Sequence, residues 1–279
     1  MNKHKLEFVK ISPEHEFAGV GFAGNIFITL NALTYLGEGD KLFVDMESNE
    51  CVCTEKDVVL HDTMNSWEYY FDQITIEPNE SINVMNSLIP ANIYYENRDF
   101  FMYPENFVEL KNKFYDSFKL KPYLIELLET YYNENLKGKI TLGVQVRLTD
   151  MKHYHNVSPV SNYIDKIKDI LKERPEIEQI FLATDDNEVI DILNENINIP
   201  ILYYKDMFRA DAANPHLHPY DRFKADRELH RYKLGIECIQ EIFTLSKCDY
   251  LLKADVSSVS IIASILAENI KQVYKLWFT

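Results

Sequence analysis

Polar residues that suit the binding of an anion gather at three places in the second half of the chain, at 145–150, 183–186 and 253–260. Each run follows an apolar stretch and precedes a pattern typical of a helix. Arg147 carries a guanidinium that can hold two oxygens of a diphosphate at once. The hydroxyls of Ser257 and Ser258, with the amides of the helix that they open, suit the same ligand.

Each of these residues also has a purely structural interpretation. Arg147 can pair with Asp150, and Thr184 or Asp185 can cap the helix that follows. Ser257 is a residue type that helix N-caps favour. Three polar strand ends in one sheet nevertheless favour a binding site, because ligands of open parallel sheets bind beyond the carboxyl ends of the strands.

The strands and helices that must position these residues can be predicted in the second half of the chain. Strands are predicted at 140–147, 179–183, 199–204, 250–253 and 272–276, and helices at 159–171, 188–193, 233–246 and 257–268. Strands that alternate with helices predict a parallel sheet covered on both faces.

The first half is read more coarsely. A glycine-rich turn at 19–25 precedes a buried helix expected at 26–36 and a strand at 41–45. Residues 104–136 predict two helices that separate near Lys121 and Pro122. The predicted domains are residues 1–137, an N-terminal lobe, and residues 138–279, a C-terminal lobe. A single larger α/β domain is the alternative.

Charge and composition restrict the class of partner. The 29 Lys and Arg against 44 Asp and Glu give a net charge of −15, which disfavours nucleic acids and anionic membrane surfaces. The four cysteines do not suggest a disulfide framework in a chain of this length. The sequence lacks an apolar run of about 18 residues and a leader pattern. We therefore expect a folded, cytoplasmic protein without an integral membrane segment.

The three polar runs resemble the donor-binding motifs of GDP-fucose fucosyltransferases. The motifs read V-Q-V-R-L-T-D at 144–150, F-L-A-T-D-D at 181–186 and L-S-K-C-D-Y-L-L-K-A-D-V-S-S-V-S at 245–260. They are most similar to the α1,6-fucosyltransferases and their rhizobial nodulation relatives, and less so to protein O-fucosyltransferases and α1,2-fucosyltransferases. Gly21-Phe-Ala-Gly24-Asn25 resembles an early loop of several of these groups.

The resemblance implies a GT-B fold with two Rossmann-like lobes, in which residues 1–137 form the acceptor side and residues 138–279 bind the nucleotide sugar. It also implies inverting transfer of fucose from GDP-fucose to a glycan hydroxyl without a metal cofactor. Glu241 lies where the α1,6 family places a carboxylate on the guanine edge, and Glu237 is the fallback. The donor-binding residues that the resemblance and the chemistry predict are Gly21, Gly24, Asn25, Gln145, Arg147, Asp185, Asp186, Arg231, Glu241, Ser257 and Ser258.

The first motif departs from the family pattern H-x-R-R-T-D-K. Gln145, Leu148 and Met151 replace its histidine, second arginine and lysine. The basic stretch 221–233 offers a replacement for the two lost cations through Arg227 or Arg231. The alternative is that this stretch is a solvated helix face.

Inverting transfer needs a general base for the acceptor hydroxyl. His155, or else His153, follows the first motif and has a suitable ordinary pKa. Other interpretations stay open. They are a metal site at these histidines, a metal-dependent transferase that uses Asp185 and Asp186, a transferase for another nucleotide sugar, and a non-catalytic nucleotide- or glycan-binding protein. The sequence does not predict an oligomeric state.

Overall fold

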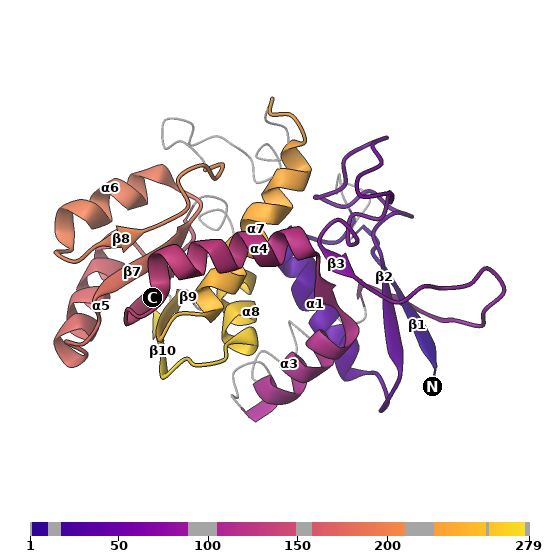
Figure 1. Ribbon diagram of the computed structural model, residues 1–279, viewed down its shortest axis with the longest axis horizontal. Helices are drawn as coiled ribbons and strands as arrows, with labels where there is room; N and C mark the ends of the chain where they lie inside the picture. Colours follow the sequence, from indigo (N-terminus) through magenta and orange to yellow (C-terminus); the bar gives the residue numbers. More distant parts are fainter. Residues whose placement is uncertain are drawn as a thin grey trace. The chain divides into compact units, whose positions relative to one another are not determined.

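The computed structural model describes residues 2–10, 18–88, 105–148, 158–209, 226–254 and 257–276. They belong to two compact units (Figure 1). Unit 1 spans residues 1–126 and 227–238, and unit 2 spans 127–226 and 239–279. The lobe boundary expected after residue 137 stays a prediction. None of the helices within the described ranges is long and apolar enough to cross a membrane.

Unit 2 is built on a five-stranded parallel sheet with the order β10-β9-β6-β7-β8. The strands are β6 (Thr141–Val146), β7 (Gln179–Thr184), β8 (Ile201–Leu202), β9 (Tyr250–Ala254) and β10 (Gln272–Leu276). From β6 the chain first adds strands on one side and then returns to add β9 and β10 on the other. The strand order therefore reverses between β6 and β9, as it does at the ligand crevice of Rossmann-like folds.

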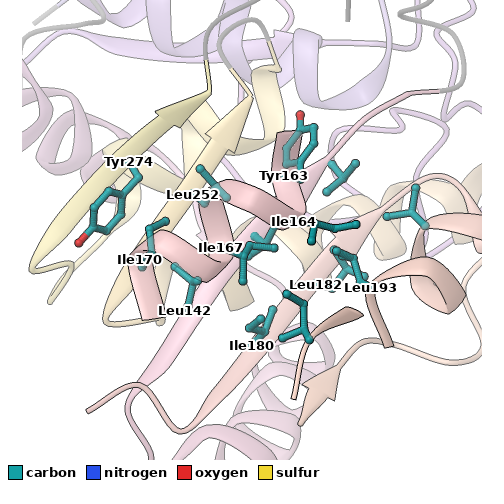
Figure 2. Packing of buried hydrophobic residues seen from close by; sticks show 14 of the residues in the cluster. Leu142, Tyr163, Ile164, Ile167, Ile170, Ile180, Leu182, Leu193, Leu252 and Tyr274 are labelled. Atoms are coloured by element: carbon teal, nitrogen blue, oxygen red, sulfur yellow. The ribbon is translucent and has the colours of Figure 1, made fainter. Parts of the chain in front are cut away.

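One face of this sheet packs on α5 (Val160–Glu173) and α6 (Asn187–Asn196). Figure 2 shows Ile164 and Ile167 of α5 among the strand side chains, such as Leu182. The alternate residues Leu142 and Val144 of β6 point into the same core, as the period of two in a strand requires. The apolar face of α5 thus fixes which strand residues turn away from this core.

The opposite face is covered by other elements of the chain. A Cβ on Gly143 would lie 3.0 Å from Leu245 of α7 (His230–Ser246), so the glycine permits close approach of this helix. The ring of Phe181 contacts those of Tyr131 and Tyr204 at 6.0 and 5.8 Å between centroids. Helix α8 (Ser258–Leu266) follows β9 directly and packs on it.

Unit 1 has a smaller parallel sheet with the order β2-β1-β4. Its strands are β1 (Lys3–Glu7), β2 (Lys41–Asp45) and β4 (Asn83–Asn86), while β3 (Phe71–Asp72) and β5 (Lys119–Leu120) form a separate antiparallel pair. The remaining described helices that begin in this unit are α1 (Phe22–Thr34), α3 (Glu105–Ser117) and α4 (Pro122–Tyr131), and α4 continues into the π-helical turn η2 (Tyr132–Leu136).

The sequence prediction is confirmed for the alternating strands and helices of unit 2, although β8 is shorter than expected. The two helices predicted around Lys121 and Pro122 are also present. Strand β1 was not expected, because it is mostly charged. Its Lys5 lies 2.7 Å from a carboxylate oxygen of Asp45 and 2.8 Å from one of Glu7, and these ion pairs satisfy the charge inside the sheet.

Helix α1 begins at Phe22, four residues earlier than the predicted start at Ile26. Gly24 therefore lies inside the helix, where a Cβ would come within 2.3 Å of Val20 Cγ2. The true turn residue is Gly19, whose φ of +68° lies in the region that favours glycine. A glycine needed for packing was thus interpreted as a turn signal.

Ile167→Ala tests the core of unit 2, because Ile167 is fully buried between α5 and the sheet. We expect a loss of about 2–5 kcal/mol in the free energy of unfolding, from lost burial and the residual cavity. Urea unfolding followed by circular dichroism measures it. Lys168→Ala, one residue along on the exposed side of the same helix, should change this free energy by less than about 0.5 kcal/mol. Equal effects of the two substitutions would contradict the packing.

Candidate functional site

The carboxyl ends of β6 and β7 are joined through Asp185. The Leu148 amide donates to Asp185 Oδ1 at 3.2 Å, and Arg147 Nε lies 3.9 Å from Asp185 Oδ2. Burial and the charge of Asp185 together raise the pKa of Tyr163 in α5. The structure therefore brings two predicted site residues, Arg147 and Asp185, to the same edge of the sheet. Asp185 orients the start of the segment after β6 and lies beside the guanidinium.

Two buried polar atoms flank the point where the strand order reverses. Gln145 is 3% exposed near the end of β6, and Ser257 is 3% exposed just after β9. Within the described ranges, Gln145 Oε1 and Ser257 Oγ have no hydrogen-bond partner. A buried polar atom without a partner costs about 1–3 kcal/mol. Gln145 Oε1 can therefore accept a hydrogen bond from a bound molecule, and Ser257 Oγ can donate or accept one.

Helix α8 starts at this same place. Ser257 occupies its N-cap position without a side-chain capping bond, and Ser258 is its first residue. The first backbone bond of the helix runs from the Ile261 amide to the Ser257 carbonyl at 3.1 Å. The amides before Ile261 lie in the first turn, where a helix has donors left for an anion.

Asp186 has a structural role that can be read from its contacts. It is the N-cap of α6, and its Oδ1 accepts from the Glu188 amide at 3.0 Å. Asp186 is 5% exposed, and its own amide donates to Thr184 Oγ1 at 3.3 Å. The capping interpretation offered for this segment thus applies to Asp186, and its donor-binding role stays a prediction.

The two carboxylates considered for the guanine edge differ in their surroundings. Glu237, in unit 1, accepts from Arg227 Nη1 and Nη2 at 2.7 and 3.4 Å, which is a fork-like ion pair. Glu241, in unit 2, lies near Tyr204 of the segment after β8. The pKa of Tyr204 is raised mainly by burial and in part by the charge of Glu241. Glu241 thus shares a unit with the edge of β6 and β7, whereas Glu237 is engaged elsewhere.

The remaining predicted residues belong to unit 1. Asn25 is fully buried, its Oδ1 accepts from the Val20 amide at 2.8 Å, and its Nδ2 has no partner among the described residues. Gly21 is the N-cap of α1. Arg231 forms an ion pair with Glu50 and donates to the Thr54 carbonyl at 3.2 Å. These contacts tie the glycine-rich turn and the start of α7 to unit 1.

Sequence reasoning missed two buried cations of unit 2. Lys253 of β9 is 2% exposed, and Arg209 is 8% exposed. Arg209 donates to the carbonyls of Thr184 and Tyr204 at 3.1 and 2.8 Å and so joins the ends of β7 and the segment after β8. The period of two along β9 could have indicated which sheet face Lys253 takes. No pattern in the polar segment around Arg209 indicates that this residue is buried.

Both predicted base candidates, His153 and His155, lie outside the described residues, as do Asp150 and Met151. Within the described ranges, the carboxylate, imidazole and thiol side chains do not form a group of three that could hold a metal ion. The predicted absence of a metal cofactor stays a prediction.

Comparison with solved structures shows the fold. Fucosyltransferase NodZ from Bradyrhizobium has a TM-score of 0.56 at 13% identity, over 96% of this chain and 94% of that one. NodZ soaked with GDP-fucose, described as an alpha-1,6-fucosyltransferase, gives 0.55 at 12% identity, over 95% and 93% of the two chains. A mutant of Arabidopsis thaliana FUT1 in complex with GDP gives 0.52 at 12% identity, over 100% of this chain and 71% of that chain. The predicted fold class, α/β and GT-B-like with parallel sheets, is confirmed.

Comparison of sequences adds little. No family model matches the chain. Ribonuclease VapC4 from Methanocaldococcus jannaschii is 37% identical over 83 residues, which cover 30% of this chain and 61% of that protein. The match thus spans about three fifths of the curated relative's length.

Asp186→Ala tests the capping role of this carboxylate. Loss of the bond to the Glu188 amide should lower the free energy of unfolding by about 0.5–2 kcal/mol, and Asp186→Asn should retain most of it. Thermal and urea unfolding measure the change, with Asp191→Ala on the exposed side of the same helix as control. An Asp186→Ala protein as stable as wild type would remove the cap from this account.

Proposed function

We propose that this chain is a glycosyltransferase that moves fucose from GDP-fucose to a glycan hydroxyl, with inversion and without a metal. The observation that carries the proposal is the reversal of strand order between β6 and β9, flanked by Gln145 Oε1 and Ser257 Oγ, which have no hydrogen-bond partner among the residues that the structure describes. Nucleotides bind at such a reversal in Rossmann-like sheets. The GDP or GDP-fucose named for the NodZ and FUT1 structures suggests which nucleotide to test.

Arg147 is assigned to the diphosphate of the donor. As the bond between fucose and phosphate breaks, negative charge grows on the departing GDP. A guanidinium beside it stabilises that charge more in the transition state than in the ground state. The amides of the first turn of α8, with Ser257 and Ser258, share this role in the proposal.

Glu241 is assigned to the guanine base and Gln145 to the base or ribose. Guanine presents adjacent N–H donors on one edge, and a carboxylate can accept both. Gln145 Oε1 is an acceptor buried at the end of β6, so it suits a ribose hydroxyl or a base N–H. Gly21, Gly24, Asn25, Asp185, Asp186 and Arg231 remain further candidates for donor contacts.

In the proposed reaction the acceptor oxygen attacks the anomeric carbon of fucose from the side opposite the phosphate. A new bond forms from this oxygen to the carbon, the bond from the carbon to the phosphate oxygen breaks, and GDP leaves with the electron pair. His155, or else His153, takes the proton of the acceptor hydroxyl, because an imidazole titrates near neutral pH.

Alternative functions differ from this one in the nucleotide sugar that is used or in whether the ligand is turned over. A transferase of the same fold can use another nucleotide sugar, and a non-catalytic relative would bind a nucleotide or glycan without turnover. The ribonuclease activity in the VapC4 name is not carried over, because a net charge of −15 opposes binding of a phosphate backbone. Cytoplasmic location stays a prediction.

Nucleotide binding is the first test. We expect GDP and GDP-fucose to raise the melting temperature of the protein by mass action, and UDP and dTDP to leave it unchanged. Arg147→Ala should weaken GDP binding and abolish release of GDP from GDP-fucose.

The matched control is Arg174→Ala. The Arg174 guanidinium donates to Gln272 Oε1 at 2.8 Å. Gln272 is the first residue of β10, so Arg174 lies at the amino ends of the strands, opposite the candidate site. Loss of Arg174 should leave GDP binding unchanged. Stabilisation by UDP alone would refute the guanine assignment. Equal turnover by wild type and Arg147→Ala would refute the assignment of Arg147.

Metal removal tests the mechanism. Transfer from GDP-fucose to a glycan acceptor should continue at an undiminished rate in excess EDTA, because Arg147 and the helix N-terminus carry the charge that a metal would otherwise carry. Turnover measured as GDP release, with and without added Mg²⁺ or Mn²⁺, provides the check. Loss of activity in EDTA that a divalent cation restores would favour the metal-dependent alternative with Asp185 and Asp186.

A further inference from the structure

An exposed histidine of unit 1, His61, lies in a turn with an unfavourable backbone conformation. Leu60 and Thr63 exchange two backbone hydrogen bonds of 3.0 and 3.1 Å and enclose only His61 and Asp62. Both enclosed residues have positive φ angles, of 52° and 63°. Glycine or asparagine usually occupies such positions, because most side chains are strained there. Strain of this kind is retained at functional sites, which points to a role for the imidazole.

The His61 ring is held by two tyrosines of the same unit. It stacks on Tyr123 with 5.1 Å between centroids and 12° between planes, and its Nε2 lies 2.9 Å from the Tyr232 hydroxyl. Tyr232 in turn stacks on the fully buried Tyr70 at 5.8 Å between centroids. The Tyr70 hydroxyl donates to the Tyr232 carbonyl at 3.0 Å. The imidazole is therefore exposed to solvent but fixed by contacts with the core of the unit.

A chain of hydrogen bonds determines which imidazole nitrogen carries the proton. The Tyr69 carbonyl can only accept, so the Tyr123 hydroxyl donates to it at 2.7 Å. Since Tyr123 has a single proton to donate, the Tyr232 hydroxyl donates to Tyr123 at 3.1 Å. The proton of Tyr232 is then used as well, so the Nε2–H of His61 donates to Tyr232. In the neutral imidazole, Nδ1 is therefore the nitrogen with the lone pair.

The protonation of the tyrosines supports this order. Burial and the hydrogen bond from Tyr232 raise the pKa of the Tyr123 hydroxyl. Tyr123 thus keeps its proton at neutral pH and remains a donor to the carbonyl. The direction of the whole chain, and with it the acceptor character of His61 Nδ1, follows from this one fixed donor.

The surroundings of His61 favour a neutral ligand with hydroxyl groups. The loop 55–64 carries three carboxylates and one lysine, so an anion such as a diphosphate is disfavoured there. In the same loop Val59 and Met64 are 61% and 42% exposed. A sugar ring fits both features, because it carries hydroxyl donors beside apolar C–H groups. Nδ1 can accept from such a hydroxyl, and the exposed apolar side chains can cover the C–H groups.

We propose that His61 Nδ1 accepts a hydrogen bond from a sugar hydroxyl and that residues 59–64 bind part of the glycan acceptor. The inference rests on the proposed function, in which a glycan hydroxyl receives the fucose. Tyr123 and Tyr232 are positioning residues, because they orient the imidazole and place its proton on Nε2. An imidazole that is already oriented loses less conformational entropy when the sugar binds.

Two substitutions of His61 separate binding from structure. Glutamine places an amide N–H near the position of Nε2 and leaves the position of Nδ1 empty, whereas asparagine places its amide near Nδ1. His61→Gln should thus keep the bond to Tyr232 and lose the proposed contact with the sugar. His61→Asn should lose the bond to Tyr232 and keep a polar group for the sugar.

The probes are the methyl glycosides of glucose, galactose and N-acetylglucosamine. Each is titrated into isotope-labelled protein, and binding is followed by the NMR shifts of the amides of residues 60–63. We expect at least one glycoside to bind wild type. His61→Gln should weaken that binding at least about fivefold, and His61→Asn should weaken it less.

His4→Gln is the matched control. His4 belongs to the same unit, and its Nε2 lies 3.2 Å from Asp40 Oδ2. Because His4 is held by a carboxylate rather than by the tyrosines, its loss should leave glycoside binding unchanged.

The position of the imidazole proton is a second measurement. Long-range proton–nitrogen NMR spectra of wild type should show His61 with its proton on Nε2, and Tyr232→Phe should give a mixture of the two tautomers. A wild-type imidazole with its proton on Nδ1 overturns the proposal. This measurement on wild type tests the proposal even where His61→Gln does not fold.

The outcomes separate this inference from the proposed function. Equal glycoside binding by wild type and His61→Gln overturns the role of His61, and so does failure of wild type to bind any of the three glycosides. Weakening by His61→Asn as strong as by His61→Gln also overturns it. GDP binding in any of these cases leaves the proposed function intact. Glycoside binding through His61 without GDP binding refutes the guanine-nucleotide function and leaves the sugar site.

Discussion

The feature on which the candidate site depends is the reversal of strand order between β6 and β9. Neighbouring parallel strands normally connect to helices that close the space beyond their carboxyl ends. Where the order reverses, the connections leave in opposite directions, and a space remains for a ligand. In this chain Gln145 at the end of β6 and Ser257 at the N-cap of α8, just after β9, flank this reversal. The core under α5 and α6 holds those strands in a register that leaves no choice about which face each residue takes.

The charges of unit 2 are distributed in a way that the net charge conceals. A chain with a net charge of −15 repels polyanions at long range, but screening limits that field to about 10 Å. Within the sheet, Arg147, Arg209 and Lys253 lie at or near three adjacent strand ends, and Asp185 is the carboxylate beside Arg147. Under the proposed function a diphosphate meets these local cations, whereas a long nucleic acid meets the net negative charge of the chain. The proposal thus accounts for an anionic ligand of an acidic protein.

Local periodicity was enough to predict the sheet of unit 2, because its strands are apolar and its helices amphipathic. The same reasoning missed β1, whose charged residues become acceptable in a strand only through ion pairs with distant Asp45 and with Glu7. It placed the start of α1 too late, because Gly24 serves a contact with Val20 rather than a turn. Contacts with residues distant in sequence determine such cases. The ion pair between Arg231 and Glu50 is another example.

The residues of the candidate site divide in the same way, into those that local patterns predict and those that contacts distant in sequence determine. Residues at strand ends, such as Arg147 and Ser257, could be predicted because position in an alternating fold is a local property. Burial of a charged residue is not local, since it depends on what covers the far face of the sheet. Lys253 illustrates the difference: its motif was recognised from sequence, but its charge becomes informative only when α7 and α8 cover that face. The burial of Lys253 could thus not have been predicted from its motif alone.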